Sequence, residues 1–167
     1  MPSVRINKEL NKGIYFLTFT VNRWYYLFDR HNRWDILLKS LKYCREKKGI
    51  KIYHWVFMLN HIHIVVKSDD VIGFVRDFKT FTSKELKKNI VATEPNILKL
   101  FEEDGVYQFW QKTNMPILVA NRNFYVQKAK YIEYNPVRKG YVRSAEYWVY
   151  SSANKEDCLL ELDTIDG

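Results

Sequence analysis

Two histidines, His61 and His63, lie two positions apart in an apolar stretch of the chain. In a β-strand, side chains at i and i+2 project from the same face, so both imidazoles can converge on one divalent cation. The flanking residues 56–58 and 64–66 are apolar and indicate a buried, rigid strand that could hold such a site. Two hydrogen-bonded histidines on the polar face of an amphipathic strand would show the same spacing, so the pattern leaves both interpretations open.

A second stretch, which ends at Asn135-Pro136, contains a tyrosine that could act on phosphate. In a helix, Tyr131 and Asn135 lie one turn apart and only about 40° apart around the axis. Phe124 and Lys128 share that side of the helix. A tyrosine phenol, with an ordinary pKa of about 10, is a modest nucleophile that can form a phosphotyrosyl ester when a cation or base assists it.

The two stretches could also act together, because the amide oxygen of Asn135 could complete a metal site with His61 and His63. The alternative is that Tyr131 packs in the core and Asn135 simply precedes a proline that stops the helix. Asn-Pro is an ordinary turn opener, so this alternative is favoured when the second stretch is considered alone.

The elements that would position these residues follow from hydrophobic periodicity and turn signals. We expect strands at 14–21, 50–58, 61–67 and 115–119, and helices at 29–48, after 68–70, at 95–101 and from 121 or 123 to about 134, where Pro136 ends the last one. The order strand, helix, strand, strand, helix, strand, helix suits an antiparallel sheet with helices packed on one or both faces. The predicted fold class is therefore α+β.

The chain carries a surplus of basic residues. It has 27 Lys and Arg against 19 Asp and Glu in 167 residues, which gives a net charge of +8. Residues 154–167 alone carry −4, so residues 1–153 carry +12. A domain this basic suits a polyanionic partner, most simply nucleic acid, but a soluble domain with surplus surface lysine fits the charge equally well.

Composition excludes several classes of protein. Hydrophobic residues make up 47% of the chain and charged residues 28%, which is ordinary for a globular domain. No apolar run reaches the roughly 18 residues of a membrane span, and the first ten residues lack the apolar segment of a secretory signal. The two cysteines, Cys44 and Cys158, exclude a disulfide scaffold or a four-cysteine zinc site. We therefore expect a cytoplasmic protein in a reducing setting, with no membrane partner.

Together the two stretches resemble a known family. The histidine–hydrophobic–histidine (HUH) segment of single-tyrosine transposases is similar to residues 58–66, MLNHIHIVV. The Y-I-x-x-N-P-V-R-x-G-x-V segment of their REP-associated branch is similar to residues 131–142, YIEYNPVRKGYV. Further similarity lies at residues 15–20, 78–82 and 109–112, at Trp148 and at residues 151–152. The order and spacing of these motifs over residues 13–153 make the resemblance specific.

This resemblance implies the HUH nuclease fold, a ferredoxin-like or RRM-like antiparallel sheet with packed helices. The histidines would lie on a central strand and the tyrosine on a nearby helix. The resemblance implies a catalytic domain over residues 1–153, and the acidic C-terminal tail, residues 154–167, is a candidate for disorder.

The resemblance also implies a reaction. Tyr131 would attack a phosphodiester of single-stranded, hairpin-forming DNA, which gives a 5′-phosphotyrosyl enzyme and a free 3′-hydroxyl, so that strands can be rejoined without ATP. His61 and His63 match the metal ligands of the family, and Asn135 takes the place of a Gln four residues after the nucleophile. The implied ion is Mg²⁺ or Mn²⁺. Family members act as monomers or as homodimers, and both states stay open here.

Three basic residues are candidate phosphate contacts, namely Lys79, Arg122 and Arg138. Each would instead be a solvated surface charge in a protein without this function. The chain departs from the family at Leu59, where a proline is common, and over residues 112–119.

Two other functions are compatible with parts of the pattern. A non-catalytic, single-stranded nucleic-acid-binding domain of RRM-like fold would use the same kind of sheet but would not need the histidines, Tyr131 and Asn135. A metal hydrolase could use the histidine pair to activate water, but no acidic ligand or general base lies near the pair in the sequence, since Asp69 and Asp70 follow the strand.

Overall fold

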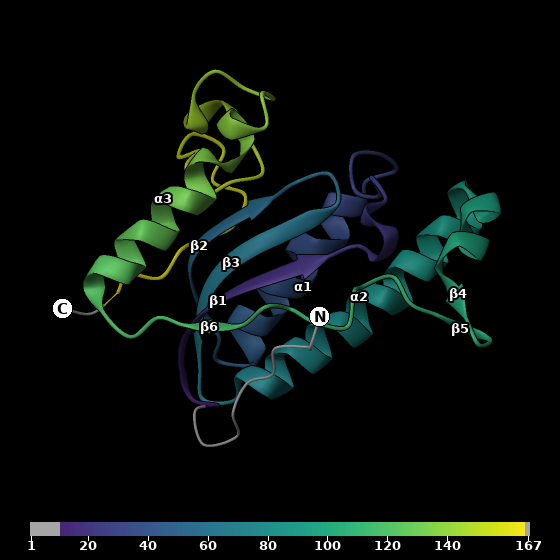
Figure 1. Cartoon of the computed structure of the whole chain (residues 1–167), viewed down its shortest axis with the longest axis horizontal. Helices are drawn as coiled ribbons and strands as arrows, with labels where there is room; N and C mark the ends of the chain where they lie inside the picture. Colours follow the sequence, from purple (N-terminus) through teal and green to yellow (C-terminus); the bar gives the residue numbers. More distant parts are fainter. Residues whose placement is uncertain (1–10, 166–167) are drawn as a thin grey trace.

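A four-stranded antiparallel sheet forms the centre of the molecule (Figure 1). The computed structural model describes residues 11–165. The strands lie in the order β2-β3-β1-β6. Their bounds are β1 (Gly13–Thr20), β2 (Lys51–Phe57), β3 (His61–Ser68) and β6 (Ile117–Leu118). Together with the first two long helices this is the β-α-β-β-α-β arrangement of ferredoxin-like folds, which confirms the predicted fold class.

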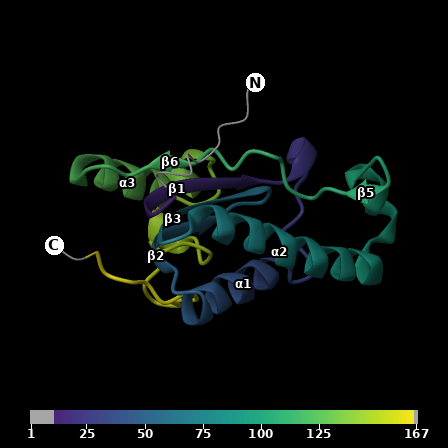
Figure 2. The same ribbon diagram turned by 90° about the horizontal axis from the view of Figure 1, so that it is seen from below.

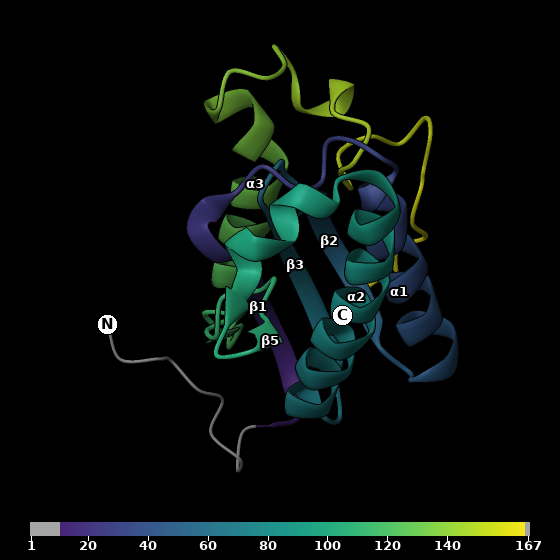
Figure 3. The same ribbon diagram turned by 90° about the vertical axis from the view of Figure 1, so that its right-hand side faces the viewer.

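Three long helices cover the two faces of the sheet. They are α1 (Arg33–Lys47), α2 (Val71–Thr93) and α3 (Arg122–Arg138). The sheet lies between α1 and α2 on one side and α3 on the other (Figure 2, Figure 3). The shorter elements are η2 (Asn22–Trp24), η3 (Pro95–Phe101), η4 (Ala145–Tyr147) and a ribbon of β4 (Glu102–Glu103) and β5 (Val106–Tyr107). No helix within residues 11–165 is long and apolar enough to cross a membrane.

Alternation along the strands divides the core into two parts. The larger part packs the sheet against α1 and α2, and it includes Leu17, Phe19, Ile62, Ile64 and Val66. The smaller part lies beneath α3, and it consists of Phe16, Tyr53, Val56, Met58, Val65 and Ile132. Because His61 and His63 have the same parity as Val65 along β3, both histidines belong to the face that α3 covers.

Two helices begin at the caps that the sequence offered. The side chain of Asp70 accepts a hydrogen bond from the Gly73 N–H at 2.9 Å, which starts α2. The side chain of Asn121 accepts one from the Phe124 N–H at 2.8 Å, which starts α3. Each cap satisfies an N–H that the first helical turn leaves without a backbone partner.

Two predicted elements are shorter than expected. The helix predicted from residue 29 begins at Arg33, because His31 and Asn32 have left-handed backbone angles, with φ of 57° and 59°. The strand predicted at 115–119 is limited to β6, whose two residues pair in register with β1.

The end of α3 corrects the prediction that Pro136 stops this helix. Pro136 lies inside α3, which continues to Arg138. The helix ends at Gly140, whose φ of 76° lets the Gly140 N–H reach the Val137 carbonyl at 2.9 Å and the Tyr141 N–H reach the Pro136 carbonyl at 3.0 Å. This pair of bonds is a Schellman motif, and glycine favours it because it has no Cβ. A proline so close to the C-terminus removes only one bond of the last turn, and the helix tolerates the loss.

The acidic C-terminal tail, a candidate for disorder from its composition, packs against α1 and β2 over its described part. Leu160 is buried in the larger core. The carboxylate of Asp163 accepts two hydrogen bonds from Arg45 on α1, at 3.0 and 3.1 Å, and the Asp163 N–H donates to the Ile52 carbonyl at 2.8 Å. The tail therefore neutralises a cation of the body of the protein, and the division into a domain and a tail stays a prediction.

Candidate active site

β3 presents His61 and His63 side by side beneath α3. Their ring centroids are 4.8 Å apart. His63 is 6% exposed, and its ring stacks on Phe16 of the neighbouring strand at 5.4 Å. The spacing of two residues therefore brings the imidazoles together on one face, as the sequence pattern predicted.

Each imidazole is held through its Nδ1 atom. His63 Nδ1 lies 2.9 Å from the Thr18 hydroxyl, and His61 Nδ1 lies 2.8 Å from Asn60 Oδ1. The Asn60 Nδ2 donates to the Trp24 carbonyl at 3.0 Å, so the oxygen of this amide faces His61. It accepts a hydrogen bond from the Nδ1–H of His61. A histidine protonated at Nδ1 has a lone pair at Nε2, which is the atom that binds a metal.

Burial keeps both histidines neutral near pH 7. It lowers the pKa of His61 to about 4, with a further contribution from the positive charge of Lys139. Burial also places the pKa of His63 well below its ordinary value, and His61, Lys128 and Arg138 lower it further. The neutral imidazole is the form that acts as a ligand.

The Tyr131 side chain, on α3, contacts His63. Its ring centroid lies 5.2 Å from that of His63, with the two rings nearly perpendicular, and 5.9 Å from that of Phe16. The side chain is 40% exposed, so its hydroxyl is within reach of a substrate in solvent. Two cations flank the ring, with Lys128 Nζ 5.4 Å and the Arg138 guanidinium 4.5 Å from its centroid.

Asn135 lies on α3, the helix that covers the two histidines, one turn after Tyr131 and one turn before Lys139. Tyr131, one turn before it, contacts His63, and Lys139, one turn after it, is the charge that acts on His61. Asn135 is 5% exposed, and its Oδ1 is buried without a hydrogen-bond partner among the described residues. A buried, unpaired acceptor is costly, and a ligand at this position would satisfy it.

These three side chains fit a divalent cation. Two neutral imidazole nitrogens and one amide oxygen form a donor set that Mn²⁺ accepts readily and Mg²⁺ accepts with its remaining positions on water or phosphate oxygens. Within residues 11–165 no group of three or more His, Cys, Asp or Glu side chains could hold a metal.

The three candidate phosphate contacts lie in different places. Arg138 is at the site, where it also donates a hydrogen bond to the Tyr131 carbonyl at 2.6 Å. Arg122 is the first residue of α3, about 13 Å along the helix axis from Tyr131. Lys79 lies on α2, and its ammonium donates to the carbonyls of Gln111 and Lys112 at 3.1 and 3.2 Å. Burial lowers the pKa of Lys79 to about 8. Only Arg138 is therefore brought next to the histidines and Tyr131.

The sequence assigned no role to two residues that support the site, Thr18 and Asn60, which contact the histidines. Lys128, which the sequence placed on the same helix side as Tyr131, lies close to the Tyr131 ring. Asn60 precedes His61 directly, and this adjacency was a weak signal of its role. Thr18 faces His63 through the register of β1 against β3, which no local pattern reveals.

Comparisons with known proteins identify the family of this chain. The family model described as "Transposase IS200 like" matches residues 10–135. A Haemophilus influenzae protein assigned as a REP-associated tyrosine transposase is 29% identical over 103 residues, which are 58% of this chain and 55% of that protein, so the match spans about half the length of this relative.

Two solved structures share the fold. A REP-associated tyrosine transposase bound to a REP hairpin has a TM-score of 0.71 and 20% identity, with 100% of this chain and 93% of that chain covered. A Deinococcus radiodurans protein assigned as a transposase has a TM-score of 0.52 and 15% identity, with 78% of this chain and 95% of that chain covered.

Proposed function

The chain belongs to the IS200-like transposase family, and from this premise we propose that it is a transposase that cleaves and rejoins single-stranded DNA through Tyr131. The observation that carries the proposal is the contact of Tyr131 with His63, whose ring centroids are 5.2 Å apart, beside a histidine pair whose Nδ1 atoms contact Thr18 and Asn60, so that Nε2 is the nitrogen that would bind a metal. A domain that only binds nucleic acid would not need a tyrosine at this position.

In the proposed reaction the Tyr131 Oη attacks a phosphodiester phosphorus. A bond forms between Oη and phosphorus, the bond from phosphorus to the 3′-oxygen breaks, and the phenol proton leaves to solvent while the 3′-oxygen takes up a proton. The products are a 5′-phosphotyrosyl enzyme and a free 3′-hydroxyl. When a 3′-hydroxyl of another strand attacks the same phosphorus, Tyr131 is the leaving group and the strands are joined without a nucleotide cofactor.

Cations of α3 support this step. Lys128 and Arg138 both lie close to the Tyr131 ring, so their charges would stabilise the negative charge that develops on the phosphate. Arg138 is fixed through its hydrogen bond to the Tyr131 carbonyl, which holds its guanidinium in place before the substrate binds. Its planar donors suit two phosphate oxygens.

His61, His63 and Asn135 would hold the divalent cation, Mg²⁺ or Mn²⁺. When bound, the ion supplies a Lewis acid that polarises the scissile phosphate. Thr18 and Asn60 keep the imidazoles oriented toward it.

The proposed substrate is a DNA stem-loop with unpaired flanks. The similar structure of a REP-associated tyrosine transposase is bound to a REP hairpin, which supports this choice, and the net charge of +8 suits a phosphate backbone. Binding should therefore weaken as the salt concentration rises. In this proposal Arg122 and Lys79 remain candidate phosphate contacts. Both oligomeric states, monomer and homodimer, remain predictions.

The test is covalent capture of labelled DNA. The wild-type protein, incubated with a labelled stem-loop and Mg²⁺ or Mn²⁺, should form an adduct that survives SDS, and Tyr131→Phe should form none. Tyr134→Phe is the matched control, because Tyr134 is also an exposed tyrosine of α3 and should leave the adduct unchanged. Cleavage that persists in Tyr131→Phe would indicate a metal hydrolase, and binding of several hairpins without cleavage would indicate an RRM-like binding domain.

A further inference from the structure

Trp24 is held on the surface in a conformation that its residue type disfavours. Its side chain is 68% exposed. Arg23 and Trp24 both have left-handed backbone angles, with φ of 62° and 52°. Side chains with a Cβ rarely adopt this region, and consecutive residues in it need support from their surroundings. Such strain at a surface aromatic residue is typical of a functional position.

One side chain connects Trp24 to the active site. Asn60 donates through Nδ2 to the Trp24 carbonyl at 3.0 Å and accepts through Oδ1 from His61 Nδ1 at 2.8 Å. A single amide group therefore lies between the backbone of Trp24 and a proposed metal ligand. The backbone of Trp24 is therefore fixed relative to His61, and the exposed indole belongs to the loop next to the histidine pair.

The loop on either side of Trp24 is anchored. Before it, the Asn22 N–H donates to the Phe109 carbonyl at 2.7 Å. After it, the Leu27 and Phe28 N–H groups both donate to the Leu59 carbonyl, at 3.1 Å each, in the turn between β2 and β3. The loop thus cannot shift without moving the turn that carries Asn60.

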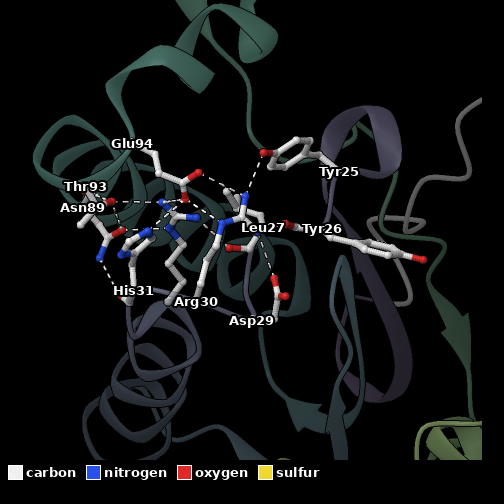
Figure 4. Close-up of polar contacts among 10 residues, drawn as sticks. Tyr25, Tyr26, Leu27, Asp29, Arg30, His31, Asn89, Thr93 and Glu94 are labelled. Carbon is white, nitrogen blue, oxygen red and sulfur yellow. Dashed lines mark hydrogen bonds and ion pairs between the residues drawn. The ribbon is translucent and has the colours of Figure 1, made fainter.

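Two arginines fix the remainder of the same loop (Figure 4). Arg30 donates to the Tyr26 carbonyl at 2.7 Å, and the buried Arg33 donates to the Leu27 carbonyl at 3.1 Å. Both guanidiniums pair with Glu94 at the end of α2. Figure 4 shows the Tyr26 ring directed away from this cluster. Tyr26 is 54% exposed. Burial raises the pKa of Tyr141, which follows α3, and the neighbouring Tyr26 raises it further.

We propose that Trp24 is a stacking platform for one unpaired base of the DNA strand that enters the active site. This proposal rests on the proposed function and names the residue that positions the strand next to the nucleophile. An exposed, preorganised indole loses little entropy when a base stacks on it, and every base has a π-face. The surrounding charges suit the DNA backbone, since Arg23 precedes the indole and Lys139 acts on His61. An exposed tryptophan in a protein contact would not need a link to His61.

The test measures binding separately from cleavage. A fluorescein-labelled stem-loop with unpaired flanks is titrated with Tyr131→Phe protein, which cannot form the adduct, and the dissociation constant is read from anisotropy. Adding Trp24→Ala should raise the constant about tenfold or more, and Trp24→Phe should stay within about threefold. Tyr43→Ala is the control, because Tyr43 is a similarly exposed aromatic residue on α1, on the opposite side of the sheet, and should leave the constant unchanged.

An abasic scan identifies the stacked base. Each flank nucleotide is replaced in turn by an abasic one, and we expect one position at which Tyr131→Phe loses about tenfold in affinity whereas Tyr131→Phe with Trp24→Ala loses none. Equal losses in both proteins at every position would overturn the platform, and so would a change below twofold for Trp24→Ala. Loss of a dimer in sedimentation, with an unchanged dissociation constant, would assign Trp24 to a protein contact and also overturn it.

The outcomes separate the two proposals. Trp24-dependent binding together with no SDS-stable adduct from the wild-type protein would overturn the proposed function and leave the platform supported. A normal adduct together with binding that does not depend on Trp24 would support the proposed function and overturn the stacking platform. No binding of any stem-loop would overturn both.

Discussion

Two buried polar side chains on opposite faces of the sheet, Arg33 and Asn135, differ in whether their polar atoms have partners. On the face that α1 and α2 cover, the fully buried Arg33 has a partner for every nitrogen of its guanidinium. Its partners are the Asn89 side chain, the Leu27 carbonyl, the Thr93 hydroxyl and the Glu94 carboxylate. On the face that α3 covers, Asn135 is almost as buried, yet its Oδ1 has no partner within residues 11–165.

This difference indicates that Arg33 contributes to stability, whereas Asn135 contributes to activity. Burial of a charge is tolerated only when it is paired and hydrogen-bonded, and Arg33 meets that condition. The α3 face instead has donor atoms in place for a group that binds from outside, at Asn135 Oδ1 and at the Nε2 atoms of the two histidines. Substitutions on the first face should therefore reduce stability, and substitutions on the second should reduce activity.

The largest expected effect is on stability, from Arg33→Ala. This change removes a buried cation and leaves its partners unpaired, so we expect the free energy of unfolding to fall by about 3–5 kcal/mol. Urea titration followed by circular dichroism measures it. At a temperature where the variant is still folded, the rate of adduct formation should match that of the wild type. A large loss of that rate would contradict the prediction that Arg33 affects stability and not activity.

The second largest effect is expected from His61→Ala, which should reduce activity rather than stability. Loss of one metal ligand should lower the rate of adduct formation about 100-fold, and calorimetric titration should show weaker Mn²⁺ binding. The midpoint of unfolding should change little, because the ring lies at the end of β3 and is partly exposed. His31→Ala provides a matched histidine control on the opposite face. Unaltered Mn²⁺ binding in His61→Ala would contradict the assigned ligand.

Asn135→Leu should separate the two properties most clearly. The rate of adduct formation should fall about tenfold or more, while the free energy of unfolding stays the same or rises by up to about 1 kcal/mol, because an unpaired buried acceptor is replaced by an apolar group of similar size. Asn135→Asp keeps an oxygen ligand and should retain most of the Mn²⁺ affinity. A clear loss of stability in Asn135→Leu would mean that the amide has a structural role.

The smallest expected effect is that of Glu94→Gln on stability, and this effect should depend on pH. The hydrogen bond from Arg30 is the largest effect on the pKa of Glu94 and lowers it. Burial opposes this shift, but the contact with Arg33 and the charges of both arginines add to it, so the pKa stays below its ordinary 4.5. Its stabilising contribution is therefore fully present above about pH 4.5 and is lost as the pH falls through the lowered value. The carboxylate is partly exposed and screened, so we expect Glu94→Gln to cost about 1 kcal/mol at pH 7 and progressively less below pH 4.5. A difference from the wild type that does not shrink on acidification would exclude this ion pair as the cause.

Much of the fold could be predicted because its signals are local. The apolar runs of β1 and β3, and the caps at Asp70 and Asn121, depend on neighbours in the sequence. The end of α3 was predicted wrongly at Pro136, since the motif at Gly140 outweighs the bond that the proline removes. The brevity of β6 depends on its register against β1, which no local pattern contains.

The site was predictable only in part. The spacing of His61 and His63 indicated one strand face, but their meeting with Tyr131 came from the resemblance to a family rather than from the residues alone. The roles of Thr18 and Asn60 depend on contacts between β1 and β3 and between the β2–β3 turn and the Trp24 loop. Lys79 was predicted as a candidate phosphate contact, with a solvated surface charge as the alternative. In the structure it is partly buried and donates to two backbone carbonyls, contacts that no local pattern reveals.

The most direct test of the reactive α3 face is to identify the atom that carries the DNA. An adduct of the wild-type protein with a stem-loop would be digested and its modified peptide sequenced by mass spectrometry. We predict a single modified residue, Tyr131, joined to the 5′-phosphate of the cleaved strand, with a free 3′-hydroxyl on the other fragment. A modification on Tyr134 or Tyr125, or a link to a 3′-phosphate, would contradict it.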